Sequence, residues 1–397
     1  MGPPHSCRGR LIRSRNPHLP PPIPFGMTTA TPRAHSRAAA LATIPFLALA
    51  LAAAAAASPR VDEPPPAATP KPAHDIAAQP LPETLVERDR LLATVRALPT
   101  KRAAWGDAEH KAGLRATETL LTARLKELGL APRLDPIDHL GGDREEAPWN
   151  NIIIDFPGTT LPAEVLIISA HFDAVPGSPG ADDDASGVAA ILEMARILKD
   201  RPMHRTVRLI LFNLEEVGLV GSRAYVGRNH DDWNDGKEKI VGMVTLDMIG
   251  YYTDEPNSQK SPLPPNSKLF QPPSVGDFLG MGGILPHRWF SQAFNTAMNE
   301  AEPRLKTVVL DFLPIAPPDL LRSDHAPFLA AGIPGIILST TAEMRNPHYH
   351  KPTDTIDTLD PERFEFAARA VLGATYRLAG PADKPAPTLA PPAPSSP

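Results

Sequence analysis

Apolar and polar positions follow two different periods along the middle of this chain. Short, almost continuous apolar runs predict strands buried on both faces; they lie at 151–156, 165–171, 206–213, 241–248 and 333–339. Elsewhere apolar residues recur every three or four positions, which predicts helices; these lie at 83–98, 107–128, 187–199, 221–229, 287–300 and after Asp360-Pro361. Strands that alternate with helices predict an α/β fold whose sheet is mostly parallel and covered by helices.

One stretch, 252–286, has neither period and is rich in proline and glycine. Connections of this length inside a compact domain usually have a function of their own. The stretch begins just after the predicted strand at 241–248, at the same end as Asp247. We therefore expect it to form part of a pocket wall or a lid.

The two ends of the chain differ from its middle in composition. The chain has 397 residues, and its 49 prolines cluster at the ends. Residues 58–82 are interpreted as a Pro/Ala-rich linker and 381–397 as a disordered Pro-rich tail. The domain that carries the apolar periods is predicted at 83–380.

Residues 1–57 have the features of an export signal. Met27 begins a better leader than Met1, so the residues before it are interpreted as an upstream mis-start. A basic segment then precedes an apolar run of small residues at 38–57, which predicts cleavage near its end. A retained membrane anchor is the alternative interpretation of this run. We expect a periplasmic or extracellular protein with no stable membrane association after cleavage.

The composition limits which partners the protein can bind and which residues can hold a metal. A hydrophobic content of 42% with 21% charged residues indicates a globular protein, and the net charge of −5 argues against nucleic acid as a partner. The single cysteine, Cys7, lies in the segment that we expect to be removed. The mature chain would then have no disulfide framework and no thiolate metal site. Any metal must be held by histidine, aspartate and glutamate.

Such residues occur where the predicted strands end. His171, Glu216 and Asp247 lie at or just beyond strand ends, and Asp183 lies in the turn after one of them. The carboxyl ends of parallel strands share one edge of a sheet, so these side chains would converge there. With His350 they form a set of imidazole and carboxylate ligands that suits zinc. Polar turns on a solvated rim are the alternative.

The adjacent pair Glu215-Glu216 suits a hydrolytic site. Neighbouring side chains at a strand end point in different directions, so one can bind metal while the other moves protons. An exposed acidic pair in a loop is the alternative. Asp173 suits a supporting role, in which it accepts a hydrogen bond from the imidazole of His171.

Six motifs in order resemble the secreted di-zinc exopeptidase superfamily that contains bacterial leucyl aminopeptidase and glutaminyl-peptide cyclotransferase. The resemblance spans about 85–380 and implies a three-layer α/β/α zinc-exopeptidase (phosphorylase/hydrolase-like) fold with a mixed, mostly parallel sheet. The motifs are HFD (171–173), GADDDASG (180–187), EEVGLVGS (215–222), LDMIG (246–250), SDHAPF (323–328) and YHKPTDT (349–355).

The resemblance also implies two zinc ions per chain. In that arrangement His171 and Asp247 would bind one zinc, and Glu216 and His350 would bind the other. Asp183 would bridge the two ions. The resemblance further suggests a cis peptide bond between Asp183 and Asp184.

Two further roles follow from the resemblance. Glu215 would be the general base that activates the attacking water. Tyr349 matches the position of a tyrosine that stabilises the tetrahedral oxyanion in some aminopeptidases. His348 is an alternative to His350 as the ligand, and we prefer His350 because it keeps the family spacing to Asp354.

These roles predict an aminopeptidase that removes N-terminal residues from peptides. A glutaminyl-peptide cyclotransferase with one zinc is the alternative. The DH-x-PF pattern at 324–328 does not separate the two, because the cyclotransferase motif region carries it as well. Asp324 and His325 match a motif near the pocket, and structural hydrogen bonding is the alternative role for them. A carboxypeptidase is less favoured because no Arg/Lys cluster stands at the motif positions. A non-catalytic binding domain would be expected to lack ligands, and none is missing.

Overall fold

The computed structural model describes residues 79–137, 148–261, 271, 273–312 and 321–391. All of them lie in one compact unit of the chain, Lys71–Pro397. The expected export signal and most of the expected linker fall outside the described residues. Among the helices of the described part, none combines the length and the apolar character that a membrane crossing requires.

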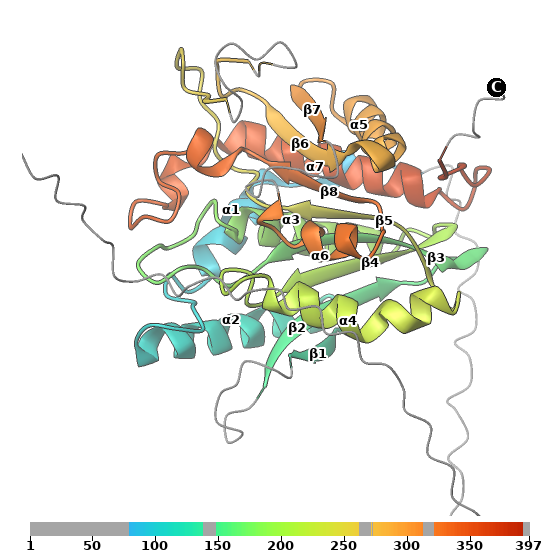
Figure 1. The fold of residues 1–397 in the computed structure, drawn as a ribbon, viewed down its shortest axis with the longest axis horizontal. Coiled ribbons are helices and arrows are strands. Elements are labelled where there is room, and N and C mark those ends of the chain that lie inside the picture. The colour runs from blue at the N-terminus through green and yellow to red at the C-terminus, as the bar shows by residue number, and fades with distance from the viewer. Residues whose placement is uncertain (1–78, 138–147, 262–270, 272, 313–320, 392–397) are drawn as a thin grey trace, which may run out of the picture. The chain divides into compact units, whose positions relative to one another are not determined.

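The described unit is organised around one mixed sheet (Figure 1). The strands run in the order β1-β2-β4-β3-β5-β8-β6-β7. The four at the centre, β4, β3, β5 and β8, are mutually parallel, and β2 and β6 flank them in the antiparallel direction. The strand bounds are β1 Arg133–Ile137, β2 Trp149–Phe156, β3 Leu161–His171, β4 Arg205–Phe212, β5 Lys239–Leu246, β6 Leu279–Ile284, β7 Thr307–Phe312 and β8 Gly335–Ser339.

Helices cover both faces of the sheet. They are α1 Arg88–Ala97, α2 Ala108–Glu127, α3 Ala185–Leu198, α4 Val220–Asn234, α5 Arg288–Ala301, α6 His325–Ala330 and α7 Pro361–Ala379. The larger core cluster joins one face to α1, α2, α3, α5 and α7, whereas the smaller joins the other face to α4 and α6. In Figure 1, α4 and α6 lie in front of the sheet and α3 lies behind it. The expected three-layer α/β/α architecture is confirmed.

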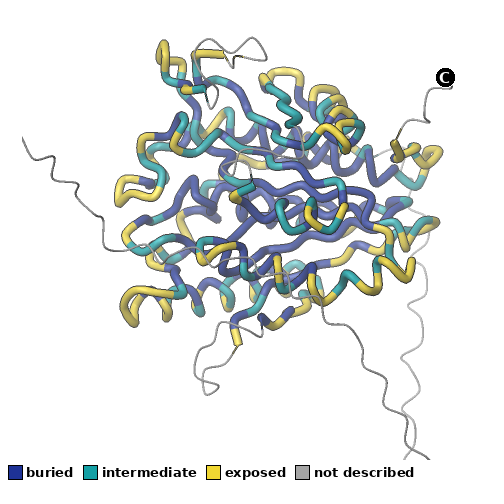
Figure 2. Tube along the Cα trace, in the orientation of Figure 1, coloured by how far each residue is buried: buried dark blue, intermediate teal, exposed yellow. Residues whose placement is uncertain are grey.

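Strand β3 shows why the apolar runs become central strands. Successive side chains of a strand point to opposite faces. Leu166 and Ile168 therefore enter the larger core cluster, and Val165 and Ile167 enter the smaller. All four are fully buried, which accounts for an uninterrupted apolar run. Figure 2 shows that the middle of the described unit is mostly buried.

Capping side chains set several helix boundaries. Asp107 accepts a hydrogen bond from the His110 amide at the start of α2, and Asp360 accepts from two amides at the start of α7. The helix expected at 83–98 is divided into a short 3-10 turn, Pro82–Leu85, and α1. The backbone is extended at Glu87, whose amide donates to the Glu193 carboxylate instead of continuing a helix.

Strands β1, β6 and β7 extend the sheet beyond the strands that the sequence predicted. Strand β6 lies within 252–286, and its sequence LGMGGI is rich in glycine, which has a low strand propensity. A close approach explains the glycines: a Cβ atom on Gly282 would lie 2.9 Å from Cγ2 of Ile337. The neighbouring strand β8 thus leaves no room for a side chain at that position.

Residues 381–391 of the expected tail contact the domain. Arg205 donates to the Pro387 carbonyl at 2.8 Å, and the Leu389 side chain is 5% exposed within the larger core cluster. These contacts place the first part of the Pro-rich segment on the domain. Residues 392–397 lie outside the described part of the chain.

Candidate metal centre

The sequence-predicted residues meet at the carboxyl ends of three neighbouring parallel strands. His171 is the last residue of β3, Glu215 and Glu216 follow β4, and Asp247 comes directly after β5. Asp183 lies in the turn before α3. Since β4, β3 and β5 are adjacent in the sheet, their ends bring these residues to one place.

One group of possible ligands consists of His171, Asp183 and Asp247. The Nε2 atom of His171 lies 3.2 Å from Oδ1 of Asp183 and 3.9 Å from Oδ1 of Asp247. The three ligand atoms all lie within 4.8 Å of one another. One imidazole and two carboxylates thus surround a volume that suits a single ion.

A second group consists of Asp183, Glu216 and His350. The Nε2 atom of His350 lies 3.1 Å from Oδ2 of Asp183 and 3.2 Å from Oε2 of Glu216. Asp183 belongs to both groups and presents a different oxygen to each histidine. The structure brings His350 to the carboxylates, whereas His348 contacts the Thr353 hydroxyl at 2.9 Å.

The electrostatics of the two groups favour a cation. Burial, reinforced by the charge of Asp183, raises the pKa of Glu216 to about 7. Burial lowers the pKa of His350, but its hydrogen bonds with Asp183 and Glu216 outweigh burial and raise that pKa to about 10. Both shifts reflect buried negative charge that a bound cation would neutralise.

The donor atoms identify which cation fits. Each group offers one imidazole nitrogen and two carboxylates, a set that zinc accepts readily. Within the described residues, the buried Oε1 atom of Glu216 has no hydrogen-bond partner, so it is available as a ligand. The residues therefore fit zinc.

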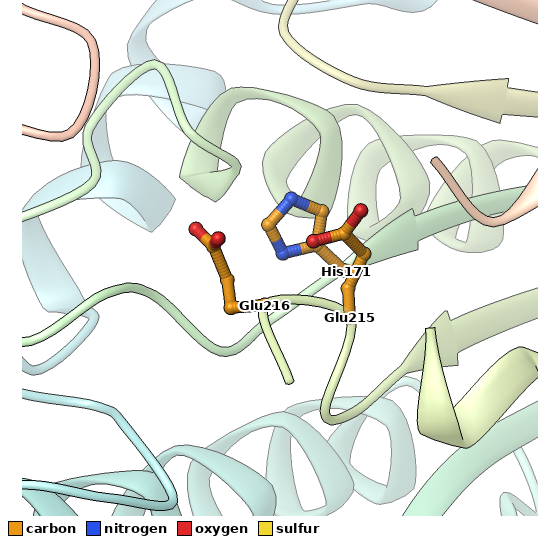
Figure 3. Close-up of side chains that lie close together, drawn as sticks. All are labelled: His171, Glu215 and Glu216. Atoms are coloured by element: carbon orange, nitrogen blue, oxygen red, sulfur yellow. The ribbon is translucent and has the colours of Figure 1, made fainter. Parts of the chain in front are cut away.

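Glu215 and Glu216 both approach the His171 ring from the turn after β4 (Figure 3). The Glu215 side chain is buried, and burial raises its pKa well above the ordinary value, opposed by His171 and reinforced by Glu216. Glu215 lies near His171 but outside the two groups that share Asp183. With His171 and Glu216 it forms a third set whose ligand atoms lie within 4.8 Å of one another, so its carboxylate stands directly beside the two groups.

Asp173 acts on the glutamate pair through their backbone. Its Oδ1 accepts from the Glu215 amide at 3.1 Å and its Oδ2 accepts from the Glu216 amide at 3.2 Å. The Nδ1 atom of His171 is 3.2 Å from the backbone carbonyl of Asp173 but 3.6 Å from its carboxylate. At 3.6 Å the expected hydrogen bond between that carboxylate and the imidazole is not formed, although the two groups remain close.

Sequence reasoning missed two further carboxylates that shape the turn of Asp183. Asp354 accepts from the amides of Asp182 and Asp183 at 3.0 and 3.2 Å. Asp182 accepts from the Gly250 amide at 2.8 Å and from the Asn346 side chain at 2.9 Å. Asp182 lies in the motif at 180–187 and Asp354 in the motif at 349–355. Their membership of these motifs was the sequence signal that could have identified them.

The backbone of this region has two non-proline cis peptide bonds. The expected cis bond between Asp183 and Asp184 is confirmed. A second cis bond joins Asp247 to Met248, and the sequence did not predict it. Both bonds involve a possible metal ligand.

Arg102 also contacts the turn that contains Asp183. Its guanidinium is buried and donates to the carbonyls of Phe172, Pro179 and Gly180. Burial lowers the pKa of Arg102, and the surrounding aspartates oppose that effect. A buried arginine thus provides hydrogen bonds to three backbone carbonyls around the turn.

A cavity of about 440 Å³ opens at the two groups. One wall is apolar and comes from β6, β7, β8 and the residue before β6; it includes Phe278, Met281, Val308, Leu310, Phe312 and Ile337. Part of 252–286 therefore lines the pocket, as the sequence analysis expected of a pocket wall.

Tyr349 also lines the cavity, and its ring stacks on the His350 ring at 3.8 Å. Burial raises the pKa of the Tyr349 hydroxyl, so this group keeps its proton at neutral pH. Arg322 donates to the hydroxyl oxygen at 2.9 Å. The hydroxyl can therefore act as a hydrogen-bond donor toward the cavity.

Asp324 and His325 are both buried, at the start of α6. Burial raises the pKa of Asp324 to about 7. Neither residue lines the cavity or belongs to the two groups that share Asp183. Both carboxylate oxygens of Asp324 are buried without a hydrogen-bond partner among the described residues, so the structure does not decide between a role near the pocket and structural hydrogen bonding.

Comparison with known proteins identifies the family of this chain. Residues 151–272 and 288–375 match the profile of peptidase family M28. The chain is 31% identical over 241 residues to the uncharacterized protein YfbL of Escherichia coli (strain K12), covering 58% of this chain and 71% of that protein. It is 32% identical over 239 residues to aminopeptidase YwaD of Bacillus subtilis (strain 168), covering 59% of this chain and 46% of that protein.

Among solved structures, the aminopeptidase from Aneurinibacillus sp. strain AM-1 is similar in fold. The TM-score is 0.57 at 18% identity, with 78% of this chain and 97% of that chain covered. The sheet and the helices around it are thus shared at low sequence identity. The similarity to YwaD, in contrast, spans less than half of that protein's length.

Proposed function

Because the chain belongs to peptidase family M28, we propose that it is a zinc metallo-aminopeptidase that binds two zinc ions and removes N-terminal residues from peptides. The superfamily expected from the six sequence motifs is confirmed by this membership. The observation that carries the proposal is the pair of ligand groups that share Asp183. Two groups with a common carboxylate suit two ions that act on one substrate.

The ligand assignment follows the two groups. His171 and Asp247 would hold one zinc, Glu216 and His350 the other, and Asp183 would bridge them. When bound, the two ions supply Lewis acidity for the scissile carbonyl and lower the pKa of the attacking water. Asp173 fixes the backbone of the glutamate pair, so it positions both Glu215 and Glu216.

Glu215 would carry the protons. Its carboxylate accepts a proton from the water that attacks the scissile carbonyl carbon and then delivers this proton to the leaving amine nitrogen. Burial raises the pKa of Glu215 and so favours holding the proton between the two steps. Tyr349, protonated and beside His350, would donate a hydrogen bond to the developing oxyanion.

The cavity suits substrates that begin with an apolar residue. The wall from β6, β7 and β8 offers aliphatic and aromatic side chains on one side of the ligand groups. An apolar side chain would be removed from water there. Peptides that begin with leucine or phenylalanine are therefore the substrates that we expect to be cleaved fastest.

We also propose that the protein is exported and acts in the periplasm or outside the cell. The support is the basic segment followed by an apolar run of small residues at 38–57. Expression of the full chain followed by N-terminal sequencing of the exported form tests this. A mature N-terminus near residue 58 supports export, and an intact N-terminus in the cytoplasm contradicts it.

The activity is tested on the purified mature protein with and without a chelator. Leucyl and phenylalanyl substrates, dipeptides and N-terminal glutamine peptides are compared, and zinc is counted per chain. Chelator-sensitive release of N-terminal residues with two zinc ions supports the proposal. Cyclisation of N-terminal glutamine with one zinc would support the cyclotransferase alternative, and no turnover of any substrate would contradict both.

A further inference from the structure

We propose that Arg223 binds the C-terminal carboxylate of a short peptide, so that the enzyme prefers dipeptides with a free carboxylate. This inference rests on the proposed aminopeptidase function and names its substrate class. Arg223 lies in the first turn of α4 and lines the same cavity as the two ligand groups. The sequence motifs alone did not reveal a cation at this place.

Among the described residues, the cavity is lined by two arginines, and they differ in their partners. Arg322 is engaged, because it donates to the Glu343 carboxylate at 2.6 Å and to the Tyr349 hydroxyl at 2.9 Å. The exposed side chain of Arg223 has no hydrogen bond or ion pair with any described residue. Its guanidinium is therefore available to a ligand.

The backbone couples Arg223 to the proposed base. The Arg223 amide donates to the Leu219 carbonyl at 2.9 Å, and the Leu219 amide donates to the Glu215 carbonyl at 2.8 Å. Two successive hydrogen bonds thus hold the first turn of α4 on the turn that carries Glu215. The backbone of Arg223 and that of the proposed base are therefore connected on the same side of the cavity.

The length of the ligand follows from that placement. A fully extended residue spans about 3.5 Å, so the carboxylate of a dipeptide lies only a few ångströms beyond the scissile bond. One turn of helix rises about 5.4 Å, so a residue in the first turn of α4 stays close to the base. A cavity of about 440 Å³ also lies in the smaller part of the usual range for ligand sites.

The charge pattern of the cavity makes a cation favourable for binding an anionic substrate end. Five carboxylates line it: Asp183, Glu215, Glu216, Asp247 and Glu343. A substrate carboxylate would be repelled by those that zinc does not neutralise. The planar guanidinium of Arg223 offers paired donors that match a carboxylate, which makes arginine well suited to this role.

The test compares three leucine substrates that differ at the end recognised by Arg223. They are the dipeptide Leu-Ala, its amide Leu-Ala-NH2, and leucine 4-nitroanilide. For zinc-loaded R223Q we expect kcat/KM for Leu-Ala to fall about tenfold, chiefly because KM rises. A tenfold change corresponds to a loss of about 1.4 kcal/mol of binding free energy. The amide and the nitroanilide should change less than about twofold, because an arginine that contacts only the carboxylate leaves their affinity almost unchanged.

Two variants serve as controls. R223K keeps the charge but loses the paired donors, so it should retain part of the preference for Leu-Ala. R96Q removes an exposed arginine from α1, outside the cavity, and should leave all three substrates unchanged. An equal loss for all three substrates in R223Q would overturn the inference, as would a wild type that does not distinguish the acid from the amide.

A binding measurement separates this inference from the proposed function. Calorimetry on zinc-loaded E215Q, with and without R223Q, gives the affinity for Leu-Ala and for Leu-Ala-NH2 without turnover. Weaker binding of Leu-Ala alone in the double variant supports the inference, even if the wild type cleaves nothing and the proposed function fails. Cleavage of the nitroanilide by the wild type, together with unchanged binding in the double variant, leaves the function in place and overturns the inference.

Discussion

The carboxylate of Asp354 accepts a hydrogen bond of 3.2 Å from the backbone amide of Asp183. The two residues are far apart in sequence, and this contact holds the proposed bridging ligand in its turn. The second oxygen of Asp354 accepts from the neighbouring Asp182 amide. The geometry of the proposed zinc centre therefore depends on a carboxylate that is itself no ligand.

We expect D354N to loosen the zinc centre without removing a ligand. The two amides donate to different oxygens of Asp354, so in asparagine one of these oxygens is replaced by an amino group and one buried amide would face another donor. Zinc affinity should fall by about 10- to 100-fold, and the free energy of unfolding by about 1–3 kcal/mol. Zinc titration and urea unfolding measure the two effects. Wild-type zinc affinity in D354N would contradict the role of this residue.

Glu215 and Glu216 should respond differently to the same substitution. E215Q removes the proposed base but keeps all five proposed ligands, so both zinc ions should remain while kcat falls by roughly 10²–10⁴. E216Q replaces an anionic ligand, so zinc content and stability should both fall. Metal analysis of both purified variants beside the wild type decides between them. Loss of zinc in E215Q with full zinc in E216Q would reverse the two roles.

The apolar wall should control the size of the first residue. V308W adds bulk at a position of β7 that lines the cavity. We expect kcat/KM for leucyl and phenylalanyl substrates to fall at least about tenfold, since a pocket discriminates by about 1–3 kcal/mol per methylene group. Alanyl substrates, which need less room, should change by less than about threefold. An equal loss for all three substrates would place the first residue elsewhere.

The length of the C-terminal segment should affect stability. A chain that ends at Gly380 loses the burial of Leu389 and the acceptor of Arg205 at Pro387, whereas a chain that ends at Pro391 keeps both. Burial of a leucine side chain contributes about 1.5–3 kcal/mol, so the shorter chain should unfold at lower urea concentration. L389A in the full chain should reproduce most of this loss. Equal unfolding midpoints for the two truncated chains would refute the proposed contribution.

Local sequence was sufficient to locate β2, β3, β4, β5 and β8, and the proposed ligands at the ends of three of these strands. The run 165–168 is apolar at every position and fills both core faces, and His171 is a buried polar residue at the end of the same strand. The alternation with helices makes neighbouring strands parallel, so their carboxyl ends must meet. For these reasons His171, Glu216 and Asp247 could be grouped before any coordinates were known.

Only the tertiary structure decided contacts that depend on side-chain geometry across long separations. Strand β6 has a weak local signal, and it forms because its glycines fit against β8. The sequence could not show whether the Asp173 carboxylate accepts from an imidazole or from backbone amides. In the folded chain it accepts from the amides of Glu215 and Glu216. Arg223 comes directly after the motif at 215–222, and nothing in the sequence distinguishes it from other exposed arginines. Only the folded chain shows that it lines the cavity. Apolar periodicity determines which residues are buried, but distances between polar atoms are set by the packing of the whole domain.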